Sequence, residues 1–87
     1  MRRRIYVETS IPSFYFEVRA EPEMVARREW TKQWWSHAHG RDELVTSEAV
    51  LNELSRGGHP RRQECLALLS DLSMLPIGRA IAETVKA

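Results

Sequence analysis

Two glutamates stand where their carboxylates could bind a metal ion together. Glu8 ends a short apolar run, residues 4–7, whose composition is typical of a β-strand. Glu53 falls in a helical pattern that comes directly after the next strand-like run, residues 43–46. Because ligand sites in open α/β sheets form outside the carboxyl ends of the strands, we expect both acids at one edge of the sheet. Carboxylate oxygens are preferred ligands of Mg²⁺ and Mn²⁺, so the pair predicts a divalent-metal site.

Basic side chains follow Glu53 closely in the sequence. Arg56, Arg61 and Arg62 lie in one short segment, although the net charge of the whole chain is only +1. Phosphate binding depends on such local clusters more than on net charge, so these arginines could contact RNA. The alternative is a solvated face without a ligand.

Three tryptophans lie in a segment with helical periodicity. Trp30, Trp34 and Ala38 repeat four residues apart, which predicts a helix face buried in the core or against a second copy of the chain. Exposed indoles, including that of Trp35, could instead stack on nucleic-acid bases. The helical spacing favours packing.

Length and composition indicate a small globular protein. The 87 residues suffice for a single domain, and 43% hydrophobic with 29% charged residues is ordinary for a folded soluble chain. The lone Cys65 excludes a disulfide framework and favours a reducing compartment. No apolar run approaches the ~18 residues needed to span a bilayer, and the N-terminus lacks the apolar segment of a signal peptide. We therefore expect a cytoplasmic protein.

Strand-like and helical segments alternate along the first half of the chain. Ser10 can begin a short helix with Pro12 in its first turn. Pro22 opens a longer helical pattern that reaches residue 39, and Gly40 is a natural stop. Ser47 is a good N-cap for the helix that contains Glu53 and ends at the following glycine pair.

The second half continues the alternation. Pro60 begins a helix whose apolar stripe consists of Cys65, Leu68, Leu69 and Leu72. Residues 73–76 read as a short strand, and Ile77, Ile81 and Val85 begin a further helical pattern. That pattern is still running at the last residues without a stop signal, so it looks interrupted. The whole order predicts an α/β fold with a parallel sheet and helices on both faces.

Three segments together resemble the PIN-domain family. They are IYVETSIPSF at residues 5–14, the tryptophans with Thr31 at residues 30–35, and TSEAVLNELSRG at residues 46–57. The nearest branch is the VapC-type toxins of bacterial toxin–antitoxin modules. The resemblance runs from Arg4 to Ala87 and covers the first two thirds of such a domain.

PIN domains are metal-dependent ribonucleases in which acids gather at the carboxyl edge of a parallel sheet. The resemblance implies that Glu8 matches the first acid, where most of the family has Asp, and that Glu53 matches the second. Thr9 and Ser10 match the hydroxyl residues beside the first acid, and Ser10 would help to orient a carboxylate or a water. The implied cofactor is Mg²⁺ or Mn²⁺, and the implied substrate is RNA.

The same resemblance implies a cognate antitoxin as a partner, and the apolar helices predict a homo-oligomer. The family's third and fourth acids belong to a helix and a strand that come after the matched part. We therefore expect the 87-residue chain, a PIN-like domain that looks truncated, to have little ribonuclease activity of its own. The alternative is a catalytically silent PIN remnant that acts as an interaction module, binding itself or an antitoxin.

Overall fold

A parallel β-sheet forms the centre of the structure, a computed structural model that describes residues 2–75 and 85–86. Its strands are β1 (Arg4–Tyr6), β2 (Glu43–Thr46), β3 (Ser73–Met74) and β4 (Val85–Lys86). The strand order is β3-β2-β1-β4, and every neighbouring pair is parallel. Ile5 pairs with Leu44, which fixes the register of the central strands.

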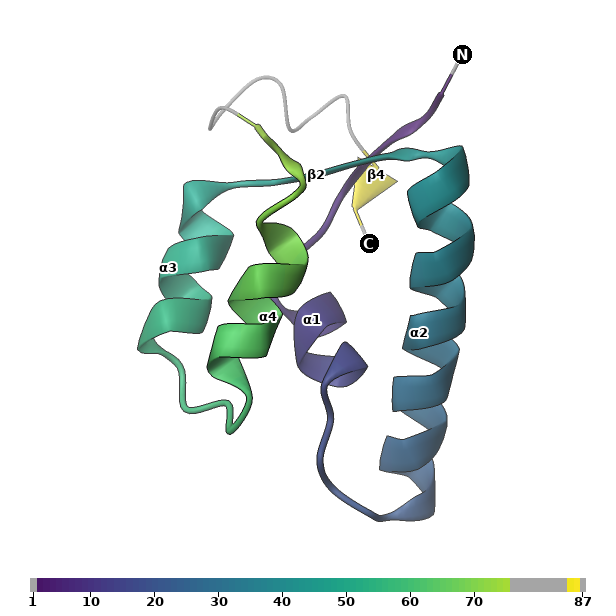
Figure 1. The fold of residues 1–87 in the computed structure, drawn as a ribbon, viewed down its shortest axis with the longest axis vertical. Coiled ribbons are helices and arrows are strands. Elements are labelled where there is room, and N and C mark those ends of the chain that lie inside the picture. The colour runs from purple at the N-terminus through teal and green to yellow at the C-terminus, as the bar shows by residue number, and fades with distance from the viewer. Residues whose placement is uncertain (1, 76–84, 87) are drawn as a thin grey trace.

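Four helices connect the first three strands. They are α1 (Ser10–Tyr15), α2 (Pro22–Arg41), α3 (Glu48–Arg56) and α4 (Arg62–Leu69). Both crossovers step across the sheet in the same direction, and right-handed crossovers of this kind place their helices on one face. Accordingly α1 contacts both α2 and α4, and all four helices lie below the strands in Figure 1. The predicted α/β fold with a parallel sheet is confirmed, whereas the described helices cover one face and not two.

The ends of α1, α2 and α3 follow the sequence prediction closely, with one exception, whereas α4 begins at Arg62 and not at the predicted Pro60. α2 begins at Pro22, α3 follows Ser47, and α3 ends at Gly57. The exception is Gly40, which lies inside α2, because the helix continues until Asp42 caps it with its backbone N–H bonded to the carbonyl of Ala38 at 2.7 Å.

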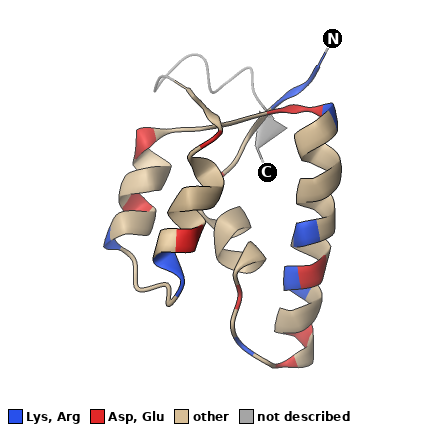
Figure 2. Ribbon diagram, viewed as in Figure 1, with Lys and Arg blue, Asp and Glu red and all other residues tan. Residues whose placement is uncertain are grey.

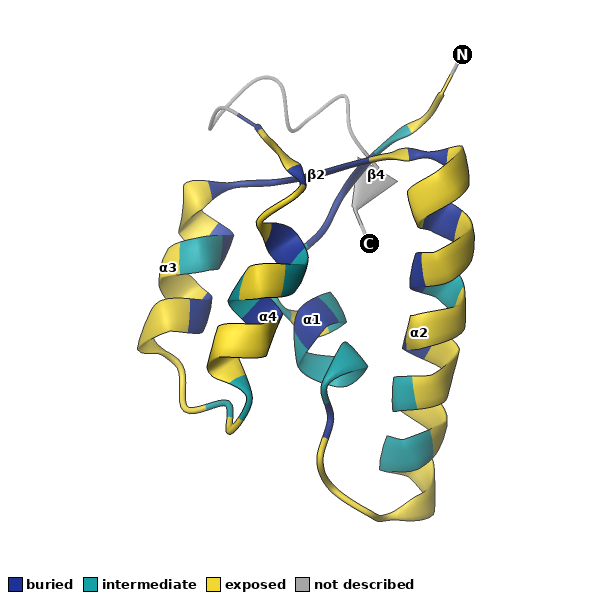
Figure 3. Cartoon of the chain, in the orientation of Figure 1, coloured by how far each residue is buried: buried dark blue, intermediate teal, exposed yellow. Residues whose placement is uncertain are grey.

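The core lies between the sheet and the helix layer. Figure 3 shows that burial is concentrated in the strands and in the sides of the helices that face one another. The strands contribute Ile5, Tyr6, Val7, Leu44 and Val45, and the helices contribute Trp35, Ala38, Val50, Leu54, Cys65 and Leu69. The central strands β1 and β2 are mostly buried, as strands of a parallel sheet usually are, whereas both residues of the edge strand β3 are exposed.

Cys65 belongs to this core. Its thiol is fully buried and donates a hydrogen bond to the carbonyl of Pro12 at 3.4 Å, which ties α4 to α1. Burial raises the pKa of the thiol, so the group stays protonated and packs as a small apolar residue.

Of the stripe predicted on α2, Ala38 is buried in the core of the chain, whereas the prediction is wrong there for Trp30 and only partly right for Trp34. Trp30 is 68% exposed and Trp34 is only half-buried, while the buried line consists of Thr31, Trp35 and Ala38. Thr31 tolerates burial because its hydroxyl donates to the carbonyl of Arg27 at 2.6 Å. Because its hydroxyl has a partner, Thr31 can be buried. The buried face of α2 therefore lies to one side of the line through Trp30 and Trp34 that apolar spacing indicated.

The final helical pattern is also corrected where it is described. Val85 lies in β4, paired with Ile5 of β1, so it is part of a strand and not of a helix. An open edge of β1 offers backbone groups for pairing. Ile77, Ile81 and Pro76 lie outside the described residues.

Glu17 is a buried acid that sequence patterns did not single out. Its carboxylate accepts both N–H groups of the Arg19 guanidinium fork, at 3.0 and 2.7 Å, and the backbone N–H groups of Val18 and Arg19. Its own carbonyl accepts a bond from Arg28 of α2. These bonds lower the pKa of Glu17 from 4.5 to about 2, with the Arg19 side chain as the largest cause. Glu17 therefore fixes the connection between α1 and α2.

We predict that Arg19→Ala raises the pKa of Glu17 towards 4.5, because only the backbone donors remain. A carboxylate with a lowered pKa stabilises the fold above its ordinary pKa and loses that contribution as the pH falls through the lowered value. The variant should thus lose the contribution at a higher pH than the wild type. A pH titration of the Glu17 carboxyl by NMR measures the pKa. Arg28→Ala is the matched control, since Arg28 touches the carbonyl and not the carboxylate, and an unchanged pKa in Arg19→Ala would contradict the assignment.

Candidate metal and phosphate site at the carboxyl edge of the sheet

Hydrogen bonds hold the carboxyl ends of β1 and β2 together. The N–H of Val7 donates to the carbonyl of Val45 at 2.8 Å, and the hydroxyl of Thr46 donates to the carbonyl of Val7 at 3.1 Å. The hydroxyls of Tyr6, which precedes Val7, and Ser47, which follows Thr46, share a buried hydrogen bond of 2.7 Å. These bonds fix the position of the chain just after β1, and Glu8 is the residue that follows Val7.

Glu53 is brought to this edge from the second turn of α3. Its Oε1 accepts a hydrogen bond of 2.8 Å from the hydroxyl of Thr9, the residue next to Glu8. The bond joins positions 44 residues apart in the sequence. Glu8 is half-buried and Glu53 is exposed, so solvent and solutes can reach the pair.

The strand order places Glu8 at a switch point of the sheet. The chain steps from β1 outward to β2 and β3, and β4 then pairs with the opposite side of β1. In open α/β sheets, ligands bind in the crevice outside the carboxyl ends of the strands at such a reversal of order. Glu8 comes two residues after β1, the strand from which the order diverges.

The oxygen donors at this edge fit a hard cation. Mg²⁺ is commonly bound through one or two carboxylates, and waters and substrate phosphates complete its octahedron. Glu8 and Glu53 supply two such carboxylates without nitrogen or sulfur ligands, which suits Mg²⁺ or Mn²⁺ better than Zn²⁺. Within residues 2–75 and 85–86, no group of three or more His, Cys, Asp and Glu residues is arranged to hold a metal ion by itself.

The hydroxyl that bonds to Glu53 is that of Thr9, whereas the sequence singled out Ser10 as the residue that orients a carboxylate. Ser10 is the exposed first residue of α1, whereas Thr9 makes the bond to Glu53. Two adjacent hydroxyl residues after Glu8 were the signal in the sequence. Only the path of the chain from β1 into α1 decides which of the two side chains faces α3.

The basic residues around the turn between α3 and α4 serve different purposes. Figure 2 shows Lys and Arg at this end of the two helices, beside an acid on α4. That acid is Glu64, which pairs with Arg61; the hydrogen bond from Arg61 lowers the pKa of Glu64. The Arg61 guanidinium also lies over the ring of Phe16, 4.8 Å from its centroid.

Arg62 is held by the end of α3. Its guanidinium donates to the carbonyls of Ser55 and Gly57, at 3.1 and 3.3 Å, so it caps the carboxyl end of that helix. Arg56 is exposed and makes no salt bridge within the described part of the chain. Of the three arginines, Arg56 is the one whose charge is open to a phosphate, one helical turn from Glu53.

His59 joins the same turn to α1. Its Nδ1 accepts the backbone N–H of Arg61 at 2.9 Å, and its Nε2 donates to the carbonyl of Ser13 at 3.0 Å. An acceptor at Nδ1 and a donor at Nε2 define one neutral tautomer. His59 is therefore a structural link and not a phosphate ligand in this arrangement.

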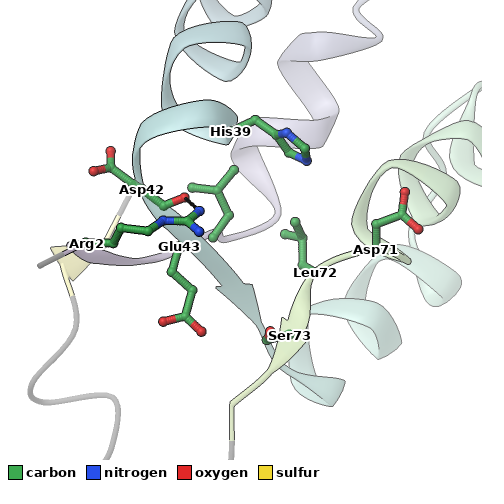
Figure 4. A pocket seen from close by; sticks show the side chains of 8 residues that line it. Arg2, His39, Asp42, Glu43, Asp71, Leu72 and Ser73 are labelled. Atoms are coloured by element: carbon green, nitrogen blue, oxygen red, sulfur yellow. Dashed lines mark hydrogen bonds between the residues drawn. The ribbon is translucent and has the colours of Figure 1, made fainter.

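A hollow of about 360 Å³ lies at the opposite edge of the sheet, where β2 and β3 begin. It is lined by Arg2, His39, Asp42, Glu43, Leu44, Asp71, Leu72 and Ser73. In Figure 4 the carboxylates of Glu43 and Asp71 point in different directions, and Arg2 is bonded to the carbonyl of Asp42. The groups do not converge on one point, so this hollow lacks the geometry of a metal site.

Comparison of the chain with models of protein families, with curated proteins and with solved structures finds no match. None of the described helices is long and apolar enough to cross a membrane.

We predict that Thr9→Val weakens Mn²⁺ binding because Glu53 loses the hydroxyl that orients it. Loss of such an orienting partner typically costs about 10-fold or more in metal affinity. The pair is exposed, so the free energy of unfolding should fall by less than about 1 kcal/mol. Isothermal titration with Mn²⁺ measures the affinity and a urea melt measures the stability. Ser10→Ala is the control, and equal losses in both variants would contradict the assignment to Thr9.

We further predict that Arg62→Ala lowers the free energy of unfolding by about 1 kcal/mol, because two carbonyls at the end of α3 lose their donor. Arg56→Ala should leave stability within about 0.5 kcal/mol of the wild type, as surface substitutions usually do. Chemical denaturation compares the two variants. The opposite order would show that Arg62 does not act as the cap.

Proposed function

We propose that this domain is a metal-dependent ribonuclease of the PIN type, of the VapC-like toxin branch, with Glu8 and Glu53 as its metal ligands. The observation that carries the proposal is the bond between Thr9 and Glu53. It ties the acid of α3 to the residue that follows Glu8, near the carboxyl end of β1, where the order of the strands reverses. The resemblance of residues 5–14 and 46–57 to PIN domains supports the same assignment.

Each residue has a defined part in this proposal. Glu8 and Glu53 hold the Mg²⁺ or Mn²⁺ ion, and Thr9 fixes the orientation of the Glu53 carboxylate. When bound, the ion lowers the pKa of a coordinated water and offsets the charge that develops on the scissile phosphate. Arg56 contacts a neighbouring RNA phosphate, where its charge increases affinity without reading the base sequence.

The rival function is that of a catalytically silent interaction module, which would bind a second copy of the chain or an antitoxin. Two observations favour it. Within the described residues, no three or more His, Cys, Asp or Glu side chains are grouped to hold a metal ion, and a large apolar side chain, Trp30, is 68% exposed. Two independent measurements, one of metal binding and one of RNA cleavage, distinguish the two functions.

We predict that Glu8→Gln and Glu53→Gln each weaken Mn²⁺ binding by more than about tenfold, since each removes one of two charged ligands. Titration followed by Mn²⁺ electron paramagnetic resonance measures binding. Cleavage of a labelled RNA in the presence of Mn²⁺ measures activity, and any cleavage should disappear in both variants. Glu29→Gln on α2 is the matched control, because Glu29 is an exposed acid on another element.

The outcomes separate the candidates. Mn²⁺ binding that depends on both acids, together with cleavage that depends on them, supports the nuclease. Binding without cleavage favours the silent module. Mn²⁺ affinity that is the same in wild type, Glu8→Gln and Glu53→Gln would overturn the metal site itself.

A further inference from the structure

The outer side of α2 is an uncovered helix face. α2 stands at the edge of the helix layer, where it contacts α1 and β2, and no helix of the described residues lies beyond it (Figure 1). Figure 3 shows exposed residues along this side of the helix. Trp30 is 68% exposed there, and Trp34 follows one turn later as a half-buried residue that packs against the core. Two neighbouring indoles on an open face are a costly surface to leave in water.

The residues of this face are arranged symmetrically along the helix. Trp30 and Trp34 lie two residues on either side of Lys32, which is close to the middle of the 20-residue α2. Glu23 and Arg41 lie nine residues on either side of the same point. At 3.6 residues per turn, these four side chains fall within a narrow stripe, here called the Trp30 stripe. Glu23 is in the first turn of α2 and Arg41 is in the last.

Such a stripe is complementary to itself in one orientation. When two copies of α2 lie antiparallel about a two-fold axis that crosses the Trp30 stripe at the height of Lys32, whose own side chain lies over Tyr15 of α1 on the other side, Trp30 meets the partner's Trp34. In the same arrangement, Glu23 meets the partner's Arg41 at each end of the helix. Arg41 also pairs with Asp42 of its own chain at 3.4 Å, but its side chain is 63% exposed and so is accessible to a second acid. A parallel arrangement would instead place Glu23 against Glu23 and Arg41 against Arg41, with like charges opposed. The charge order therefore favours the antiparallel pair.

The remaining residues of this side do not oppose the arrangement. Arg27 would approach the partner's His37, but the Arg27 guanidinium is held over the ring of Phe14, 5.3 Å from its centroid, and so is directed towards α1. His37 donates from Nδ1 to the carbonyl of Gln33 in its own helix. Neither side chain is positioned to repel the other across the axis.

We propose that the Trp30 stripe is the dimerisation surface of this protein, and that its partner is a second copy of the same chain bound with α2 antiparallel. A two-fold axis makes every contact occur twice, which is the usual symmetry of protein dimers. The two indoles from each copy form the apolar centre, and the Glu23–Arg41 pairs form the polar ends. The proposal does not depend on Glu8 or Glu53, so a failed nuclease assay leaves it intact.

Sedimentation equilibrium of the full chain tests the surface directly. We expect a monomer–dimer equilibrium for the wild type and a dimer dissociation constant at least about 30-fold higher for Trp30→Glu, because a central tryptophan of an interface commonly carries this much affinity. Ser36→Glu is the matched control, since Ser36 is exposed on another side of α2 and receives the same charge. Its dissociation constant should stay close to that of the wild type.

Charge reversal tests the orientation. Glu23→Arg and Arg41→Glu should each weaken the dimer, because each single change opposes like charges at both ends, whereas the double variant restores opposite charges and should recover affinity. Thermal melts followed by circular dichroism show that each variant is folded. A wild type that stays monomeric at the highest soluble concentration would overturn the proposal, as would a dimer unaffected by Trp30→Glu. Loss of affinity in the double variant as large as in the single variants would overturn the antiparallel arrangement.

Discussion

The parallel pairing of β1 with β2 is the interaction on which the other features of this protein depend. A parallel pair cannot be closed by a hairpin, so the chain must travel through α1 and α2 before it returns as β2. The fixed register, with Ile5 opposite Leu44, sets where both strands end. Glu8 and the start of α3 are therefore delivered to the same edge, and the candidate site is a consequence of how the two strands pair.

Hydroxyl groups join the elements at that edge and are not used to cap helices. None of the four helices has a side-chain hydrogen bond at its N-cap, although Thr9 and Ser47 occupy two of those positions. Thr9 bonds to Glu53, and Ser47 bonds to Tyr6. Every buried side-chain nitrogen or oxygen of the described residues has a partner. A hydroxyl that bonds to a distant element fixes the position of one element relative to the other, which a local helix cap cannot do. In the buried Tyr6–Ser47 pair it also satisfies both hydroxyls.

α2 carries two neighbouring faces with different roles. One face packs on the core through Trp35 and Ala38, and the Trp30 stripe beside it remains open. The open face lies on the long outer helix, on a different element from Glu8 and α3, so an association through it would leave the carboxyl edge accessible. Glu17 and Arg19 pair within the loop that leads into α2, and Arg28 of α2 donates to the carbonyl of Glu17, which ties this loop to the helix.

The sequence by itself determined the alternation of strands and helices, because that pattern depends on local apolar spacing, proline and glycine. The run from Glu43 to Thr46, the start of α2 at Pro22 and the end of α3 at Gly57 were all predictable on this basis. The position of Glu8 after the first strand was equally a local property. Placing Glu53 at the same edge required only the rule for ligand sites in α/β sheets.

Tertiary structure decided everything that depends on rotation about a helix axis or on contacts between distant residues. It selected Thr31 over Trp30 as a buried position, since a satisfied hydroxyl removes the cost that a polar residue would otherwise pay. It assigned Thr9 and not Ser10 to Glu53, and it gave Arg61 and Arg62 structural partners. It also made Val85 a strand residue, because the free edge of β1 offered backbone hydrogen bonds that no local pattern records. Local spacing fixes which residues share an element, whereas only the packed chain fixes which side of that element is covered.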